Sequence, residues 1–209
     1  MIYINTSYHY AKHTLGFGCL LCQLETQATH GLCQDCWQNL PWRLQCIHKH
    51  QLSIHCIFDY QFPINRIIQK FKYLQQLQYQ RILLHALYRL KPTAIDAIVA
   101  MPISKQRLIE RGYNQSLYLA QRLAKHWGCA IWQPIHRHAE QRQKGLNRFE
   151  RMENIQQQFY CPENPQHPYT RVLMLDDVVT TGSSLFALAQ ALQQLGCQQI
   201  DALCLAAAT

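Results

Sequence analysis

The stretch from Val172 to Ser184 constrains the fold of this chain more than any other part of the sequence. Four apolar residues lead into two adjacent aspartates, and Val-Val-Thr-Thr-Gly-Ser-Ser follows them. We predict a strand over Arg171–Leu175, a turn over Asp176–Ser184, and a helix over Leu185–Leu195 that Gly196 ends. A strand that passes through a short turn directly into a helix is typical of α/β proteins.

The turn has the chemistry of a phosphate site. Unpaired N–H groups and a partial positive charge at the start of a helix attract phosphate, and Gly182 lets the backbone approach it. Further donors are the hydroxyl groups of Thr180, Thr181, Ser183 and Ser184. The carboxylates of Asp176 and Asp177 would repel the same phosphate, so we expect them to accept hydrogen bonds from sugar hydroxyls or to steady Mg²⁺. The alternative is an Asp pair that caps a helix after a buried strand.

Four cysteines near the start form a second pattern. Cys19 and Cys22 are followed, after ten residues, by Cys33 and Cys36, which gives two Cys-x2-Cys pairs. Four thiolates at this spacing can close a tetrahedral Zn²⁺ site and leave no position for water, so we predict a structural zinc rather than a catalytic one. Unrelated buried cysteines are the alternative.

Cys46 and Cys56 lie close to several histidines in the sequence. Their loose spacing leaves two interpretations open: a second metal site, or buried thiols and surface histidines. We therefore predict one zinc ion.

The rest of the chain alternates helices and strands. Two helices are expected within Ile64–Lys91, strands at Ile95–Met101, Cys129–Trp132 and Ile200–Ala206, and one amphipathic helix over Gln106–Trp127. Strands separated by helices predict a parallel sheet with crossover connections and a ligand site at the carboxyl ends of its strands. We expect an N-terminal segment with the zinc ribbon over residues 1–58 and a second domain over 59–209.

The chain is basic, with a formal net charge of +8, which favours an anionic partner such as nucleic acid, a phosphorylated metabolite or an acidic membrane surface. Residues 60–95 contain no acid, and the sequence Lys70-Phe71-Lys72-Tyr73 alternates cations with aromatic rings, as single-stranded DNA binders do. Phe71 also has the spacing of a core residue. A second basic group could hold DNA or close over a ligand: Arg142, Lys144, Arg148 and Arg151.

These patterns resemble known families. The Asp176–Ser184 run is similar to the site for 5-phosphoribosyl-1-diphosphate (PRPP) of type I phosphoribosyltransferases, and Arg111-Gly-Tyr-Asn-Gln115 with the four cysteines resembles the ComF/GntX family of competence proteins. The resemblance implies a phosphoribosyltransferase-like fold that binds PRPP together with Mg²⁺. It also implies a bacterial cytoplasmic protein that acts in DNA uptake during transformation or in DNA utilisation. Competence or recombination proteins are possible partners.

The same resemblance bears on catalysis. An active enzyme would transfer phosphoribose from PRPP to a nucleobase or a related acceptor. Thr180 occupies a position where some phosphoribosyltransferases carry an acid that serves as general base, and a threonine does not serve that purpose. If transfer occurs, Lys105, Arg107 and Arg111 are candidates to contact the departing diphosphate, and a solvated helix face is their alternative role.

No stretch of the sequence has the roughly 18 continuous apolar residues that a membrane span requires, and the first 18 residues do not resemble an export signal. We therefore expect a cytoplasmic protein with no membrane insertion.

Overall fold

A computed structural model describes residues 2–4, 18–26, 28–92, 94–138, 158–162 and 169–208. Its centre is a six-stranded sheet with the strand order β2-β3-β10-β9-β5-β6. The strands are β2 (Trp42–Lys49), β3 (Leu52–Asp59), β5 (Ala97–Ala100), β6 (Ala130–Ile131), β9 (Arg171–Val179) and β10 (Gln199–Ala207). All neighbouring pairs are parallel except β2 with β3, which form an antiparallel hairpin. The predicted α/β fold with a parallel sheet is confirmed.

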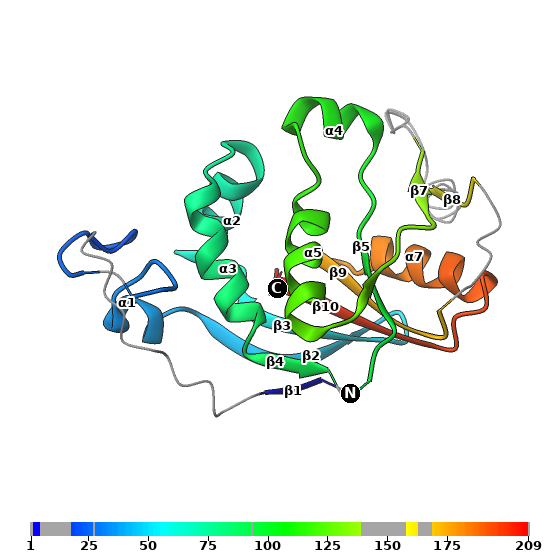
Figure 1. The fold of residues 1–209 in the computed structure, drawn as a ribbon, viewed down its shortest axis with the longest axis horizontal. Coiled ribbons are helices and arrows are strands. Elements are labelled where there is room, and N and C mark those ends of the chain that lie inside the picture. The colour runs from blue at the N-terminus through cyan, green and yellow to red at the C-terminus, as the bar shows by residue number, and fades with distance from the viewer. Residues whose placement is uncertain are drawn as a thin grey trace.

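Helices cover both faces of this sheet (Figure 1). They are α1 (Gln34–Gln38), α2 (Ile64–Tyr73), α3 (Gln80–Leu87), α4 (Lys105–Arg111), α5 (Gln115–Trp127) and α7 (Ser183–Gln194), with a short 3-10 turn at Leu77–Tyr79. Side chains alternate along β9: Leu173 and Leu175 pack in one core with α2, α3 and α5, whereas Val172 and Met174 pack in the other with α7. The two cores therefore lie on opposite faces of one sheet.

In the described part of the chain, two short strand pairs lie outside the main sheet. Strand β1 (Ile2–Ile4) runs antiparallel to β4 (Leu90–Pro92), and β7 (His136–Arg137) runs antiparallel to β8 (Phe159–Tyr160). Neither pair was predicted, since strands of two or three residues are too short to show a periodic pattern.

Strand β9 is four residues longer than predicted. Asp176 and Asp177 belong to the strand and not to the following turn, because the ladder with β10 continues to the pair Val179 and Ala207. The β-branched residues Val178 and Val179 favour this extension. Helix α7 correspondingly begins at Ser183, so the turn is limited to residues 180–182.

The predicted single helix over Gln106–Trp127 is wrong. Helix α4 ends at Arg111, Gly112 follows with a φ of 76°, and Asn114 caps α5 by accepting a hydrogen bond from the Leu117 N–H at 3.1 Å. A glycine in the left-handed region and an asparagine at the N-cap are typical end and start signals, and here they separate two helices.

The predicted boundary between residues 58 and 59 falls inside β3. Both strands of the hairpin before it belong to the main sheet, through the pairing of β3 with β10. Among the helices in the described ranges, none combines the length and the apolar character that crossing a membrane would require.

Candidate functional site: an acidic doublet and a four-cysteine cluster

The acidic doublet lies at the carboxyl end of β9, near the middle of the sheet. Asp177 follows Leu173 and Leu175 at strand spacing and therefore faces the layer of α2 and α5. It is 4% exposed. A buried carboxylate requires hydrogen-bond donors or a cation, and both are present.

Three hydrogen-bond donors of the described residues contact the Asp177 carboxylate. The Lys72 ammonium of α2 lies 2.7 Å from Oδ2, and the Gln115 amide donates to the same oxygen at 3.1 Å. The N–H of Val178 donates to Oδ1 at 2.8 Å. The Lys72 and Asp177 side chains are 18% and 6% exposed, so this ion pair is shielded from solvent far more than a surface pair would be.

Asp176 has a different environment. Its Oδ1 accepts hydrogen bonds from the Asp177 N–H at 2.8 Å and from the Ser116 hydroxyl at 3.3 Å. Burial and, next, the neighbouring charge of Asp177 raise the pKa of the Asp176 carboxyl to about 7. The doublet thus combines one carboxylate that pairs with lysine and one that binds a proton readily.

The Arg111–Gln115 segment brings Gln115 to this place. The Asn114 amide donates to the Met101 carbonyl oxygen at 3.0 Å, which fixes the start of α5 beside the end of β5. The next two residues, Gln115 and Ser116, then reach the doublet. Sequence reasoning singled out this segment but assigned no role to Gln115 or Ser116.

The same segment holds the end of α2. The Tyr113 hydroxyl donates to the Phe71 carbonyl oxygen, and the Gln75 amide donates to the Arg111 carbonyl oxygen at 3.1 Å. The Arg111 guanidinium lies over the Tyr73 ring, 5.0 Å from its centroid. Lys72 is therefore held on a helix end with several fixed contacts.

The predicted phosphate turn follows directly. Gly182 has a φ of 82° and caps α7, and the Thr181 and Ser183 hydroxyl oxygens lie 3.0 Å apart. The tip of the β2–β3 hairpin contacts this turn: the Lys49 ammonium donates to the Thr180 carbonyl oxygen, and a Cβ on Gly182 would lie 3.0 Å from the Lys49 Cβ. Sequence reasoning did not anticipate Lys49, because no local pattern joins positions so far apart.

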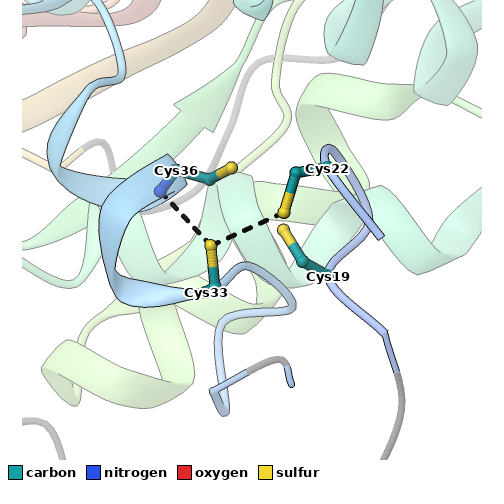
Figure 2. A group of neighbouring side chains, drawn as sticks. All are labelled: Cys19, Cys22, Cys33 and Cys36. Atoms are coloured by element: carbon teal, nitrogen blue, oxygen red, sulfur yellow. Dashed lines mark hydrogen bonds between the residues drawn. The ribbon is translucent and has the colours of Figure 1, made fainter. Parts of the chain in front are cut away.

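The four cysteines form a compact cluster (Figure 2), in which the four sulfur atoms all lie within 4.8 Å of one another. Cys22 and Cys33 have their sulfur atoms 3.8 Å apart, close to the separation that a tetrahedral zinc with Zn–S bonds of about 2.3 Å requires. All four thiols are free of disulfides. The donor set therefore fits a zinc ion, and it is the one such group of His, Cys, Asp and Glu within the described ranges.

Backbone donors support the cluster. The Leu21 N–H donates to Cys19 Sγ, and the Cys36 N–H donates to Cys33 Sγ, both at 3.4 Å. Burial disfavours the Cys19 thiolate, but backbone N–H groups, first that of Cys33, outweigh it and lower the pKa of Cys19 to about 7. Such donors orient thiolates toward a metal.

Among the described residues, Cys46 and Cys56 do not join a second cluster of metal-ligating side chains. In the hairpin ladder Cys46 is opposite His55, and Cys56 is opposite Gln45, so the two thiols point to opposite faces. Cys46 is exposed, and Cys56 is buried. Burial raises the pKa of the Cys56 thiol to about 12.

The cysteine region packs on the rest of the protein through aromatic rings. His30 stacks on Trp37 with centroids 4.2 Å apart, and Trp37 meets Trp42 edge to face at 5.0 Å. Trp42 contacts Phe58 of β3 at 4.6 Å. Cys19 and Cys33 share one apolar core with α2 and α3.

The other predicted cations lie in different settings. Lys105 is exposed on α4, Arg111 is 8% exposed, and Arg107 lies between Lys105 and Arg111 on the same helix. Lys70 donates to the Tyr79 hydroxyl at 3.1 Å, and Phe71 beside it is buried. Four predicted residues lie outside the described part of the chain: Arg142, Lys144, Arg148 and Arg151. Contacts of any of these cations with DNA or diphosphate stay predictions.

Fold and sites together define an α/β protein with an acidic doublet at the carboxyl edge of its sheet and a four-cysteine cluster that could hold a metal ion. No family model matches the chain. It is 28% identical to competence protein F of Haemophilus influenzae, over 96% of this chain and 93% of that protein. It is 30% identical to DNA utilization protein YhgH of Salmonella typhimurium, over 90% of this chain and 95% of that protein. The chain belongs to this family of competence and DNA utilization proteins.

More distant proteins resemble the chain in part. Competence protein ComFC of Bacillus subtilis is 24% identical, over 88% of this chain and 75% of that protein. Orotate phosphoribosyltransferase from Aeropyrum pernix shares 18% identity with a TM-score of 0.39, over 63% of this chain and 61% of that chain. Purine phosphoribosyltransferase from Pyrococcus horikoshii shares 19% identity with a TM-score of 0.32, over 74% of this chain and 77% of that chain.

Proposed function

We infer that this protein takes part in the uptake or utilisation of DNA, binds PRPP with Mg²⁺ at the carboxyl edge of its sheet, and contacts single-stranded DNA through its cationic residues. The names of its relatives support the first part. The arrangement of the Asp176–Asp177 doublet just before the first turn of α7 supports the second, and it is the observation on which the proposal mainly rests.

The first turn of α7 and the acidic doublet suit different groups of PRPP. The first N–H groups of α7, with the hydroxyls of Thr181 and Ser183, favour the 5′-phosphate. The doublet favours groups that donate hydrogen bonds or carry positive charge, which are the ribose hydroxyls and Mg²⁺. The buried amide oxygen of Gln115 is a further acceptor there, with no hydrogen-bond partner among the described residues. An oxygen-only donor set fits Mg²⁺.

A thermal unfolding experiment tests PRPP binding. At about a hundredfold excess over Kd, PRPP with Mg²⁺ should stabilise the protein by about 2.7 kcal/mol, which raises Tm by roughly 5–10 °C. Asp177→Asn should remove most of this shift. Asp96→Asn is the matched control, because it also breaks one aspartate ion pair, that with Arg171, and should keep the shift. An unchanged Tm at millimolar PRPP, or a full shift in Asp177→Asn, would refute the proposal.

Binding of single-stranded DNA is tested with the same protein preparation. Affinity for a labelled oligonucleotide should fall steeply with salt, because phosphate contacts release counterions. Asp177→Asn should leave that affinity unchanged if DNA and PRPP use separate surfaces. Salt-independent binding, or none, would contradict the DNA part of the proposal.

A further inference from the structure

Lys72 and Gln115 both contact one carboxylate oxygen of Asp177, and these two contacts are the basis of the inference that follows. Lys72 comes from α2 and Gln115 from α5, and the two side chains reach Oδ2 at 2.7 Å and 3.1 Å. One positive charge of the protein itself therefore already lies where a bound cation would neutralise the doublet.

Gln115 provides independent evidence that the place is built for a ligand. Its side chain is 2% exposed, and its Nε2 is bonded to Asp177. Its Oε1 is buried without a hydrogen-bond partner in the part of the chain that the structure describes. Burying an amide oxygen without a hydrogen-bond donor is unfavourable, so such an atom is expected where a ligand satisfies it.

The Lys72 ammonium lies at the end of a flexible side chain and already contacts the exposed Tyr73 ring while it binds Asp177. The lysine side chain is flexible, and its ammonium lies 5.8 Å from the centroid of the Tyr73 ring. The backbone that carries it is fixed, since the Tyr113 hydroxyl donates to the carbonyl oxygen of Phe71. The ammonium can leave Asp177 without movement of α2.

We propose that Lys72 is an internal counter-ion of the acidic doublet, which a divalent cation of the Mg²⁺ class displaces from Asp177, and that Gln115 Oε1 becomes a ligand or hydrogen-bond acceptor of the arriving group. Lys72 is then a specificity-determining residue: it keeps the doublet neutralised in the free protein and weakens its affinity for a cation that arrives alone. The inference rests on the proposed ligand site, but it concerns the cation and not PRPP.

Binding of Mn²⁺ alone, measured by the electron paramagnetic resonance signal of the free ion, tests this displacement. The zinc-loaded protein is used, because thiolates hold Zn²⁺ in preference to Mn²⁺. Lys72→Met should bind Mn²⁺ at least tenfold more tightly than the unmodified protein. Lys72→Arg, which keeps the charge, should remain close to the unmodified protein.

Lys70→Met is the matched control, because Lys70 lies on the same helix and its ammonium binds the Tyr79 hydroxyl instead. It removes the same charge and should leave Mn²⁺ affinity unchanged. In the Lys72→Met background, Asp177→Asn or Gln115→Leu should reverse the gain. Equal gains in Lys70→Met and Lys72→Met would mean a general charge effect and would overturn the proposal, as would no gain in Lys72→Met.

A second measurement covers the case that Lys72→Met folds poorly, since it leaves a buried carboxylate without its partner. Mn²⁺ should then raise the Tm of Lys72→Met by several degrees more than that of Lys70→Met, and equal shifts would overturn the proposal. The outcomes are separable from those of the PRPP experiment. If the protein does not bind PRPP but shows the Lys72-dependent Mn²⁺ effect, only the proposed function is refuted. If it binds PRPP but shows no Lys72-dependent Mn²⁺ effect, only this inference is refuted.

Discussion

Gly182 and Gly128 both adopt the left-handed backbone region, with φ of 82° and 71°, but their surroundings differ. A Cβ at Gly182 would lie 3.0 Å from the Lys49 Cβ, whereas nothing lies within 4 Å of one at Gly128. Gly182 therefore serves two purposes at once: it permits the turn before α7, and it leaves room for the hairpin.

These two glycines give a paired prediction. Gly128→Ala should lower the free energy of unfolding by about 1 kcal/mol through backbone strain alone. Gly182→Ala should cost about 1–3 kcal/mol more, because the added methyl group must also push Lys49 away. Urea unfolding of both variants measures the difference. Equal losses would show that the contact between the hairpin and the turn does not persist in solution.

His30 links stability to pH. Its ring is 3% exposed and accepts a hydrogen bond from the Leu32 N–H at 3.2 Å. Burial and, next, the nearby His85 lower the pKa of His30 to about 4. Because the unfolded chain binds this proton more readily, the stabilising contribution is present above about pH 6.5 and is lost as the pH falls toward 4.

The corresponding variant is His30→Asn, which keeps a small acceptor and lacks the titrating ring. Between pH 7 and pH 5 the unmodified protein should lose about 2 kcal/mol of unfolding free energy more than His30→Asn does. Urea unfolding at both pH values tests this. Identical losses would mean that His30 can be protonated in the folded protein.

At the scale of elements, helix α1 and the turns before it exist around the cysteine cluster. Helix α1 has five residues, too few to be stable alone, and Cys33 serves both as its N-cap and as a predicted metal ligand. We therefore expect the region to depend on a bound metal ion for its local structure, as small metal-binding units generally do.

Cys33→Ser tests this dependence. It should reduce zinc from about one ion per chain to a small fraction of that value, measured by atomic emission, and lower Tm by about 10 °C or more. Cys46→Ser is the control, because Cys46 is exposed and outside the cluster, and it should retain both zinc and Tm. Full zinc content in Cys33→Ser would contradict the assignment of the ligands.

Elements were predicted with uneven success, for physical reasons. The strong apolar runs of β9 and β10 and the periodic helices α2 and α3 were identified from the sequence. The break at Gly112 was missed because every apolar position that supported the single helix lies in α5, whereas the apolar residues of α4, Leu108 and Ile109, are exposed and form no core face. The extent of β9 depends on its pairing with β10, which sequence periodicity does not reveal.

For the molecule as a whole, residue spacing in the sequence predicted groups of residues that lie in one short segment. It did not predict contacts between residues that come from distant segments. The four cysteines and the turn before α7 lie in short segments, so the clustering of the first and the position of the second could be predicted from the sequence. The side-chain contacts of Asp177 come from α2 and α5, and the Lys49 contact of Thr180 comes from the hairpin. No pattern in the sequence shows which helices lie over the end of the sheet, so Lys72 was predicted only as a nucleic-acid contact and its ion pair with Asp177 was missed.

The contact between Lys49 and Gly182 has a practical consequence for anyone who dissects this protein. A fragment that begins at residue 59 would omit β2 and all but the last residue of β3, and β10 would become an unprotected border of the sheet. Gly182 would lose the side chain that covers it, although every residue of the Asp176–Ser184 run would still be present. Ligand measurements on so shortened a polypeptide would describe an altered turn, so the hairpin should be retained in any truncated version.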